Sequence, residues 1–76
     1  MGETELTYYQ RTVLRSVKRQ ARHGDPVPTG VVREATAGVV PYDAVDRSLK
    51  ALVRLGLISK PSRGFYLPVE EASSDA

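Results

Sequence analysis

The segment spanning residues 39–68 constrains the fold more than any other part of the chain. Val45, Leu49 and Leu52 recur there at the spacing of one buried stripe along a helix. Gly56 follows at the point where a helix commonly ends with a left-handed residue. Two short β-prone runs then surround a Pro-Ser-Arg-Gly turn. The sequence therefore predicts a helix that leads directly into a β-hairpin.

A first helix is predicted near the start of the chain. Thr7 and Gln10 have the spacing of a capping box, in which each side chain satisfies a backbone N–H at the start of a helix. Gly24 provides the predicted end of this helix. One arc of the helix is apolar and should pack inward, and it consists of Leu6, Tyr9, Val13, Val17 and Ala21.

A short strand and a second helix are predicted between these two regions. Pro26 and Pro28 exclude a helix around Val27, where we expect a very short edge strand. Thr29 is the expected N-cap of a second helix of about two turns, and Gly38 is its expected end. The side chains expected to face inward are Val32 and Ala35, with Val31 as an alternative.

Length and composition limit what the chain can be. With 76 residues, 41% of them hydrophobic, it can form one small core and no second domain. It has no cysteine and a single histidine, so we expect neither a disulfide nor a metal site. No nucleophile with a partner base and no Gly-rich phosphate loop is recognisable, so we expect no enzyme and no cofactor. An acidic start and the lack of a long apolar run predict a cytoplasmic protein that does not contact a membrane.

The charge is distributed unevenly along the chain. The net charge is only +2, from 11 basic and 9 acidic residues. Residues 8–68, however, hold all 11 basic side chains and only four acidic ones. This balance predicts a polyanion or an acidic protein as partner. Residues 1–6 and 69–76 are polar and acidic, and we expect both ends to be disordered.

The predicted order is helix, short strand, helix, turn, helix, strand, strand. The most specific signature within it is Val45-x-x-x-Leu49-x-x-Leu52-x-x-x-Gly56-Leu57-Ile58, preceded by Ala35-x-x-Gly38-Val39. Over residues 7–68 this pattern resembles the winged helix-turn-helix domains of bacterial, archaeal and viral regulators. The resemblance implies an α+β domain with three helices, a short first strand and a two-stranded β-wing.

The resemblance also implies a function. A small transcriptional regulator of this kind binds double-stranded DNA with a recognition helix, here about residues 41–56, in the major groove. Its basic wing, here about residues 57–68, contacts the backbone or the minor groove. Alternatives are a winged-helix adaptor that binds protein and an accessory domain of a replication protein, because the segment 60–66 is also similar to the wing of archaeal replicative helicases. A homodimer and an acidic protein partner remain open.

Nine residues are the candidate DNA contacts that follow from this resemblance. They are Tyr42, Asp43, Asp46, Arg47, Lys50, Arg54, Lys60, Ser62 and Arg63. On a helical wheel the basic residues of the third helix share one exposed stripe, and Lys60 and Arg63 flank the turn of the hairpin. Of Phe65 and Tyr66, one is expected to pack inward, because successive strand residues point to opposite faces.

The two aspartates of this helix are unusual on a surface that faces phosphate. Asp43 precedes Arg47, and Asp46 precedes Lys50, by the four residues that favour ion pairs along a helix. We therefore predict two such pairs. The alternative is that a carboxylate accepts a hydrogen bond from cytosine or holds an arginine against guanine.

The first helix carries a second basic surface. Arg11, Arg15, Lys18 and Arg22 are spaced to stack on one face, with Arg19 beside them. In the winged-helix arrangement this helix lies behind the recognition helix, so a solvated face is expected. Contact with phosphate at the edge of the site and a dock for an acidic partner are the alternatives, and Tyr8 and Tyr9 fit core, cap or dimer contacts.

Overall fold

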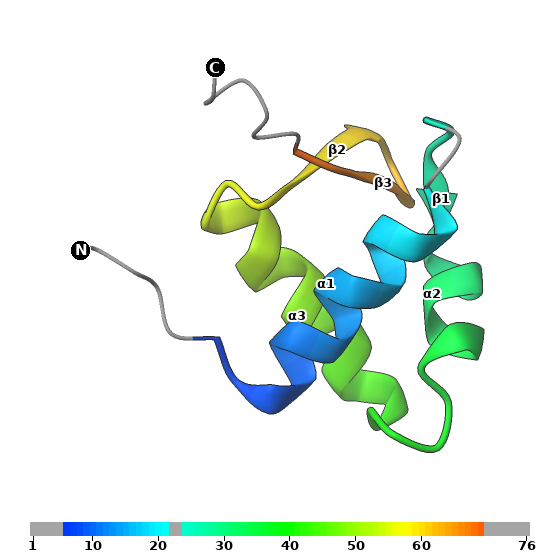
Figure 1. The fold of residues 1–76 in the computed structure, drawn as a ribbon, viewed down its shortest axis with the longest axis vertical. Helices are drawn as coiled ribbons and strands as arrows, with labels where there is room; N and C mark the ends of the chain where they lie inside the picture. The colour runs from blue at the N-terminus through cyan, green and yellow to red at the C-terminus, as the bar shows by residue number, and fades with distance from the viewer. Residues whose placement is uncertain (1–5, 22–23, 70–76) are drawn as a thin grey trace.

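A computed structural model describes residues 6–21 and 24–69, which form three helices and a three-stranded antiparallel sheet (Figure 1). Of the ends predicted to be disordered, residues 1–5 and 70–76 lie outside the described residues, as does Arg22. Leu6 and Val69 are described: Leu6 packs against the core, and the amide N–H of Val69 donates to the carbonyl of Leu57 at 3.0 Å. The elements are α1 (Tyr8–Gln20), β1 (Val27–Pro28), α2 (Thr29–Ala35), α3 (Tyr42–Arg54), β2 (Ile58–Ser62) and β3 (Phe65–Pro68). Their order along the chain agrees with the sequence prediction.

Helix α1 begins as predicted, with a complete capping box. The Thr7 hydroxyl accepts the amide N–H of Gln10 at 3.1 Å, and the Gln10 side chain accepts the amide N–H of Thr7 at 3.0 Å. Val13 and Val17 are fully buried, which confirms the inward arc. Tyr9 is the exception, because it lies at the start of the helix and is 40% exposed.

Helix α2 differs from the prediction in its start and in its inward face. It begins at Thr29 itself, and Pro28 occupies the N-cap without a side-chain hydrogen bond. Val32 is buried as expected, whereas Ala35 and Val31 are exposed. The second inward residue is Thr36, because positions four apart share a face of a helix. Its hydroxyl is satisfied by the carbonyl of Val32 at 2.8 Å.

Helix α3 carries the main buried stripe of the domain. Val45, Leu49 and Leu52 are at most 1% exposed, as their spacing predicts. Gly56 ends the helix at φ +81°, and the amide N–H of Leu57 donates to the carbonyl of Leu52 at 3.0 Å. This geometry is a Schellman motif, in which the chain reverses while the last helical carbonyls stay hydrogen bonded.

The sheet has the strand order β1-β3-β2, so the short strand β1 is an edge strand as predicted. It pairs with β3 through Val27 and Tyr66. Tyr66 is buried and Phe65 is 39% exposed, which confirms that one of the two aromatic residues packs inward. The sheet lies across one end of α1 and α3, and the core fills the space between these three elements (Figure 1).

The hairpin turn lies further along the chain than the sequence suggested. Pro61 and Ser62 belong to β2, and the turn consists of Arg63 and Gly64. Of these two turn residues, Gly64 has positive φ, at +80°, and Arg63 does not, which is the pattern of a type II turn. Strand β2 also has one extra residue opposite β3 between Ser59 and Ser62, and a bulge of this kind accommodates the missing N–H of Pro61.

We expect Leu49→Ala to unfold a large fraction of the protein at room temperature. Truncating a fully buried leucine costs about 2–5 kcal/mol, and a domain of this size rarely has more than about 3–5 kcal/mol of stability. Leu55→Ala is the matched control, because Leu55 is 43% exposed and its loss should cost less than about 1 kcal/mol. Urea denaturation followed by circular dichroism measures both. Equal losses of unfolding free energy in the two variants would contradict the assignment of Leu49 to the core.

Candidate nucleic-acid interface

The outer face of α3 is polar and exposed. Tyr42 is 70% exposed, and Arg47, Lys50 and Arg54 are exposed along the helix, opposite the buried stripe. Lys60, Ser62 and Arg63 of the hairpin are exposed as well. The basic side chains predicted from the sequence are therefore available to a partner.

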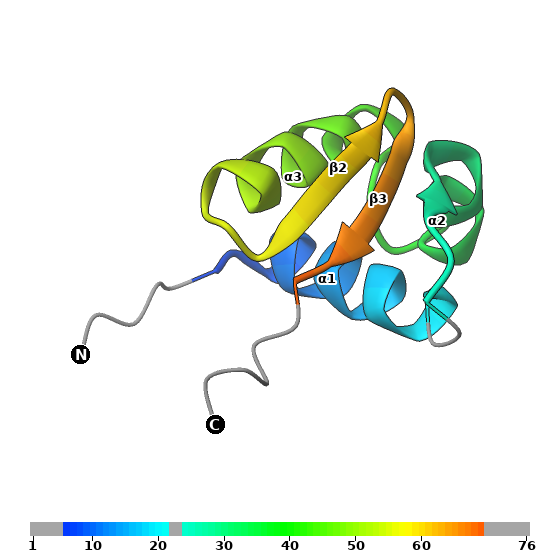
Figure 2. The same ribbon diagram turned by 90° about the horizontal axis from the view of Figure 1, so that it is seen from above.

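The elements that carry these side chains lie on one side of the domain. In Figure 2, α3 and the turn between β2 and β3 lie along the upper side of the view, and α1 crosses the lower side. An extended partner placed along α3 could reach the hairpin turn from the same direction.

The aspartate at the start of α3 forms the pair predicted for it. The Arg47 guanidinium donates to a carboxylate oxygen of Asp43 at 3.2 Å, with side chains that are 75% and 77% exposed. An ion pair this exposed contributes only about 0.3–0.5 kcal/mol. Its main effect is local, because it neutralises an acid beside a basic helix face.

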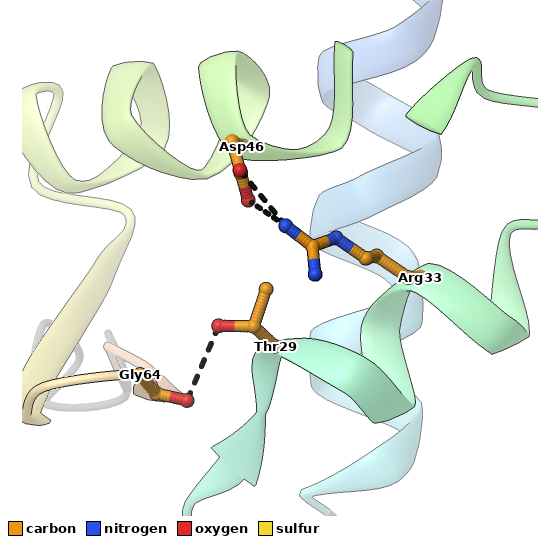
Figure 3. Close-up of polar contacts among 4 residues, drawn as sticks. All are labelled: Thr29, Arg33, Asp46 and Gly64. Atoms are coloured by element: carbon orange, nitrogen blue, oxygen red, sulfur yellow. Dashed lines mark hydrogen bonds and ion pairs between the residues drawn. The ribbon is translucent and has the colours of Figure 1, made fainter. Parts of the chain in front are cut away.

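The second aspartate has a different partner from the one predicted. Asp46 pairs with Arg33 of α2, whose Nη2 donates to both carboxylate oxygens at 2.9 and 3.1 Å, and not with Lys50 (Figure 3). The same guanidinium lies over the ring of Tyr42, 4.5 Å from its centroid. Arg33 is 28% exposed, so it is better shielded from water than the arginine of the other pair. Spacing along one helix could not reveal this contact, because it joins two helices.

A further contact fixes the hairpin turn against α2. The amide N–H and the hydroxyl of Thr29 both donate to the carbonyl of Gly64, at 3.0 and 3.2 Å (Figure 3). The threonine predicted as a helix cap thus uses its side chain to bind a residue 35 positions later in the chain. As a result, α2 is connected to α3 at one point and to the hairpin at another.

The second basic surface is exposed on α1. Arg11, Arg15, Lys18 and Arg19 are all accessible to solvent. Two of them border a depression of about 470 Å³ between α1 and the end of α2, which is lined by Thr12, Arg15, Ser16, Arg19, Gln20, Ala35 and Thr36. In Figure 2, α1, which carries these basic residues, lies on the opposite side of the domain from the hairpin turn.

A larger groove lies where α1, α2 and the start of α3 meet. It has a volume of about 640 Å³, which is within the usual range of ligand sites. Its lining is mainly apolar and aromatic, with Arg33 and Glu34 as charged members, and comprises Tyr9, Gly30, Arg33, Glu34, Ala37, Gly38, Val39, Val40, Pro41, Tyr42 and Val45. No sequence pattern indicates this groove, because its walls come from three separate elements.

Comparisons with protein-family models, with curated proteins and with solved structures gave no significant match for this chain. Within residues 6–21 and 24–69, no helix has the length and apolar character needed to cross a membrane. The same residues contain no cluster of three or more side chains suited to hold a metal ion. Functional arguments therefore rest on the surfaces described above.

The two ion pairs should contribute unequally to stability. We expect Asp46→Asn to lower the free energy of unfolding by about 1 kcal/mol, because it disrupts a partly shielded link between two helices. Asp43→Asn should cost less than about 0.5 kcal/mol, because its pair is exposed and lies within one helix. Chemical denaturation of both variants at low salt measures the difference. A larger loss for Asp43→Asn would contradict this ranking.

Proposed function

We propose that this chain is a winged helix-turn-helix domain that binds double-stranded DNA, in the manner of a small transcriptional regulator. The main support is that the exposed basic side chains of α3 and of the hairpin occupy elements on one side of the domain. Both acidic residues of α3 are engaged by arginines, so their charge opposes a phosphate backbone less than free carboxylates would. The order of helices and strands is compatible with this fold.

In this proposal α3 enters the major groove. Arg47, Lys50 and Arg54 reach base edges or the flanking phosphates, and Tyr42 and Asp43 lie near the edge of the groove. Lys60, Ser62 and Arg63 contact the backbone or the adjacent minor groove. Asp46, held by Arg33, has little freedom to accept a hydrogen bond from a base. Affinity therefore derives mainly from phosphate contacts, and sequence preference is modest.

Binding should depend strongly on salt. If four to six basic side chains contact phosphates, the logarithm of the association constant should fall against the logarithm of salt concentration with a slope of roughly −4 to −5. Fluorescence anisotropy with a random-sequence duplex across a salt series measures this slope. A slope near zero, or no binding at low salt, would remove DNA as the principal partner.

The two basic surfaces should differ in their effect on DNA binding. Arg47→Ala combined with Arg63→Ala removes two side chains from the proposed interface and should weaken binding by more than about tenfold. Arg15→Ala combined with Lys18→Ala removes the same charge from α1 and should change affinity by less than about threefold. The same anisotropy assay compares the two double variants. The reverse result would mean that α1 forms the interface.

A protein-binding adaptor is the second candidate, and the groove beside α3 favours it. Tyr9, Val39 and Tyr42 are each at least 40% exposed at that groove, and exposed aromatic and apolar groups are common in protein interfaces. An adaptor of this kind would not bind duplex DNA with the salt dependence given above. The salt series therefore separates the two candidates.

A further inference from the structure

One face of α2 points toward both α3 and the hairpin. Thr29 and Arg33 lie four residues apart, so they share this face. Thr29 binds the hairpin turn at Gly64, and Arg33 binds α3 at Asp46 (Figure 3). We call the place where α2, α3 and the hairpin turn converge the junction, and we define it by these four residues.

The guanidinium of Arg33 has only one nitrogen left for a partner. Nη2 is occupied by both oxygens of Asp46, and Nε is buried. Nη1 has no hydrogen-bond partner among the described residues and, unlike Nε, is not buried. Figure 3 shows it pointing away from Asp46, toward the side of the junction where Thr29 lies.

This nitrogen is held in place before any ligand arrives. The carboxylate of Asp46 and the ring of Tyr42 contact the guanidinium from different directions, which restricts an otherwise flexible side chain. A charged donor that is already oriented loses less conformational entropy on binding. Two more basic residues are close in sequence to the residues of the junction. Arg63 precedes Gly64, and Lys50 follows Asp46 by one helical turn.

We propose that Arg33 binds a phosphate of the DNA backbone at the junction, with Asp46 as the residue that positions it. The inference rests on the proposed function and adds a contact from α2 to it. Reading guanine needs two donor nitrogens of one arginine, and Arg33 has a single free nitrogen, so a phosphate oxygen is the better acceptor. The carboxylate on the proposed DNA face thereby has a role, because it orients an arginine that belongs to another helix.

Arg33→Gln tests the contact. Removing one phosphate contact makes the slope of log affinity against log salt shallower by about 0.9. The ratio of wild-type to variant affinity for DNA therefore falls about 3.5-fold when the salt concentration rises from about 50 to about 200 mM. This fall is the same for any DNA sequence. Lys18→Gln removes the same charge from α1 and leaves the slope within about 0.2 of the wild-type value. Arg33→Lys, which restores a cation, recovers the wild-type slope.

The results separate this inference from the proposed function. If the wild type binds DNA and a folded Arg33→Gln protein has the same salt slope as the wild type, the phosphate contact is overturned. The proposed function then stands. Absence of binding by the wild type overturns both proposals. Thermal unfolding of each variant verifies that it is folded. If Arg33→Gln is not folded, Arg33→Met replaces it, because the apolar methionine side chain can still pack on the ring of Tyr42.

The positioning role of Asp46 has to be distinguished from a simple effect on stability, which could also lower DNA affinity. With Arg33 present, Asp46→Asn removes the orientation of the guanidinium and lowers DNA affinity about two- to tenfold. With Arg33→Gln already in place, Asp46→Asn raises affinity, because only the repulsion between carboxylate and phosphate is lost. Effects of the same sign in both backgrounds overturn the positioning role.

Discussion

The burial of one stripe of α3 determines both the inside and the outside of this domain. Val45, Leu49 and Leu52 are withdrawn from water against α1 and the sheet, and the burial of these apolar side chains stabilises the fold. A helix that turns these positions inward must turn the intervening charged positions outward. The exposed basic surface is thus a geometric consequence of the core. A change in the position of α3 would displace all of the side chains of that helix that are proposed to contact DNA.

Helix α2 contributes little to the core, but its contacts hold α3 and the hairpin in position relative to each other. With only seven residues, it would be marginal as an isolated helix. Its links to Asp46 and Gly64 connect it to α3 and to the hairpin, the two elements that carry most of the proposed DNA contacts. These links restrict how far the hairpin can move relative to α3. A rigid arrangement of this kind suits the fixed spacing between a groove and the neighbouring backbone of a duplex.

The features predicted correctly from the sequence are those that residues close in the chain determine. The capping box of α1, the end of α3 at Gly56 and the buried stripe each depend on a few neighbouring positions. The features that were missed depend on residues that meet only after folding. Arg33 and Asp46 are 13 residues apart, and Thr29 and Gly64 are 35 apart, so no helical or strand period relates them. The candidate interface was therefore foreseen as a list of exposed cations, but not as an arrangement in which α2 takes part.

The bulge in β2 affects how copies of this protein can meet. Strand β2 is an outer strand of the sheet, and the other outer strand, β1, has only two residues. Pro61 offers no N–H to an approaching strand, the bulge breaks the regular spacing around it, and Lys60 adds a charge that resists close pairing. The sheet is consequently a poor template for strand addition. Under the proposed function, copies that lie side by side on one duplex would therefore meet through their helices and not by adding strands to one another's sheets.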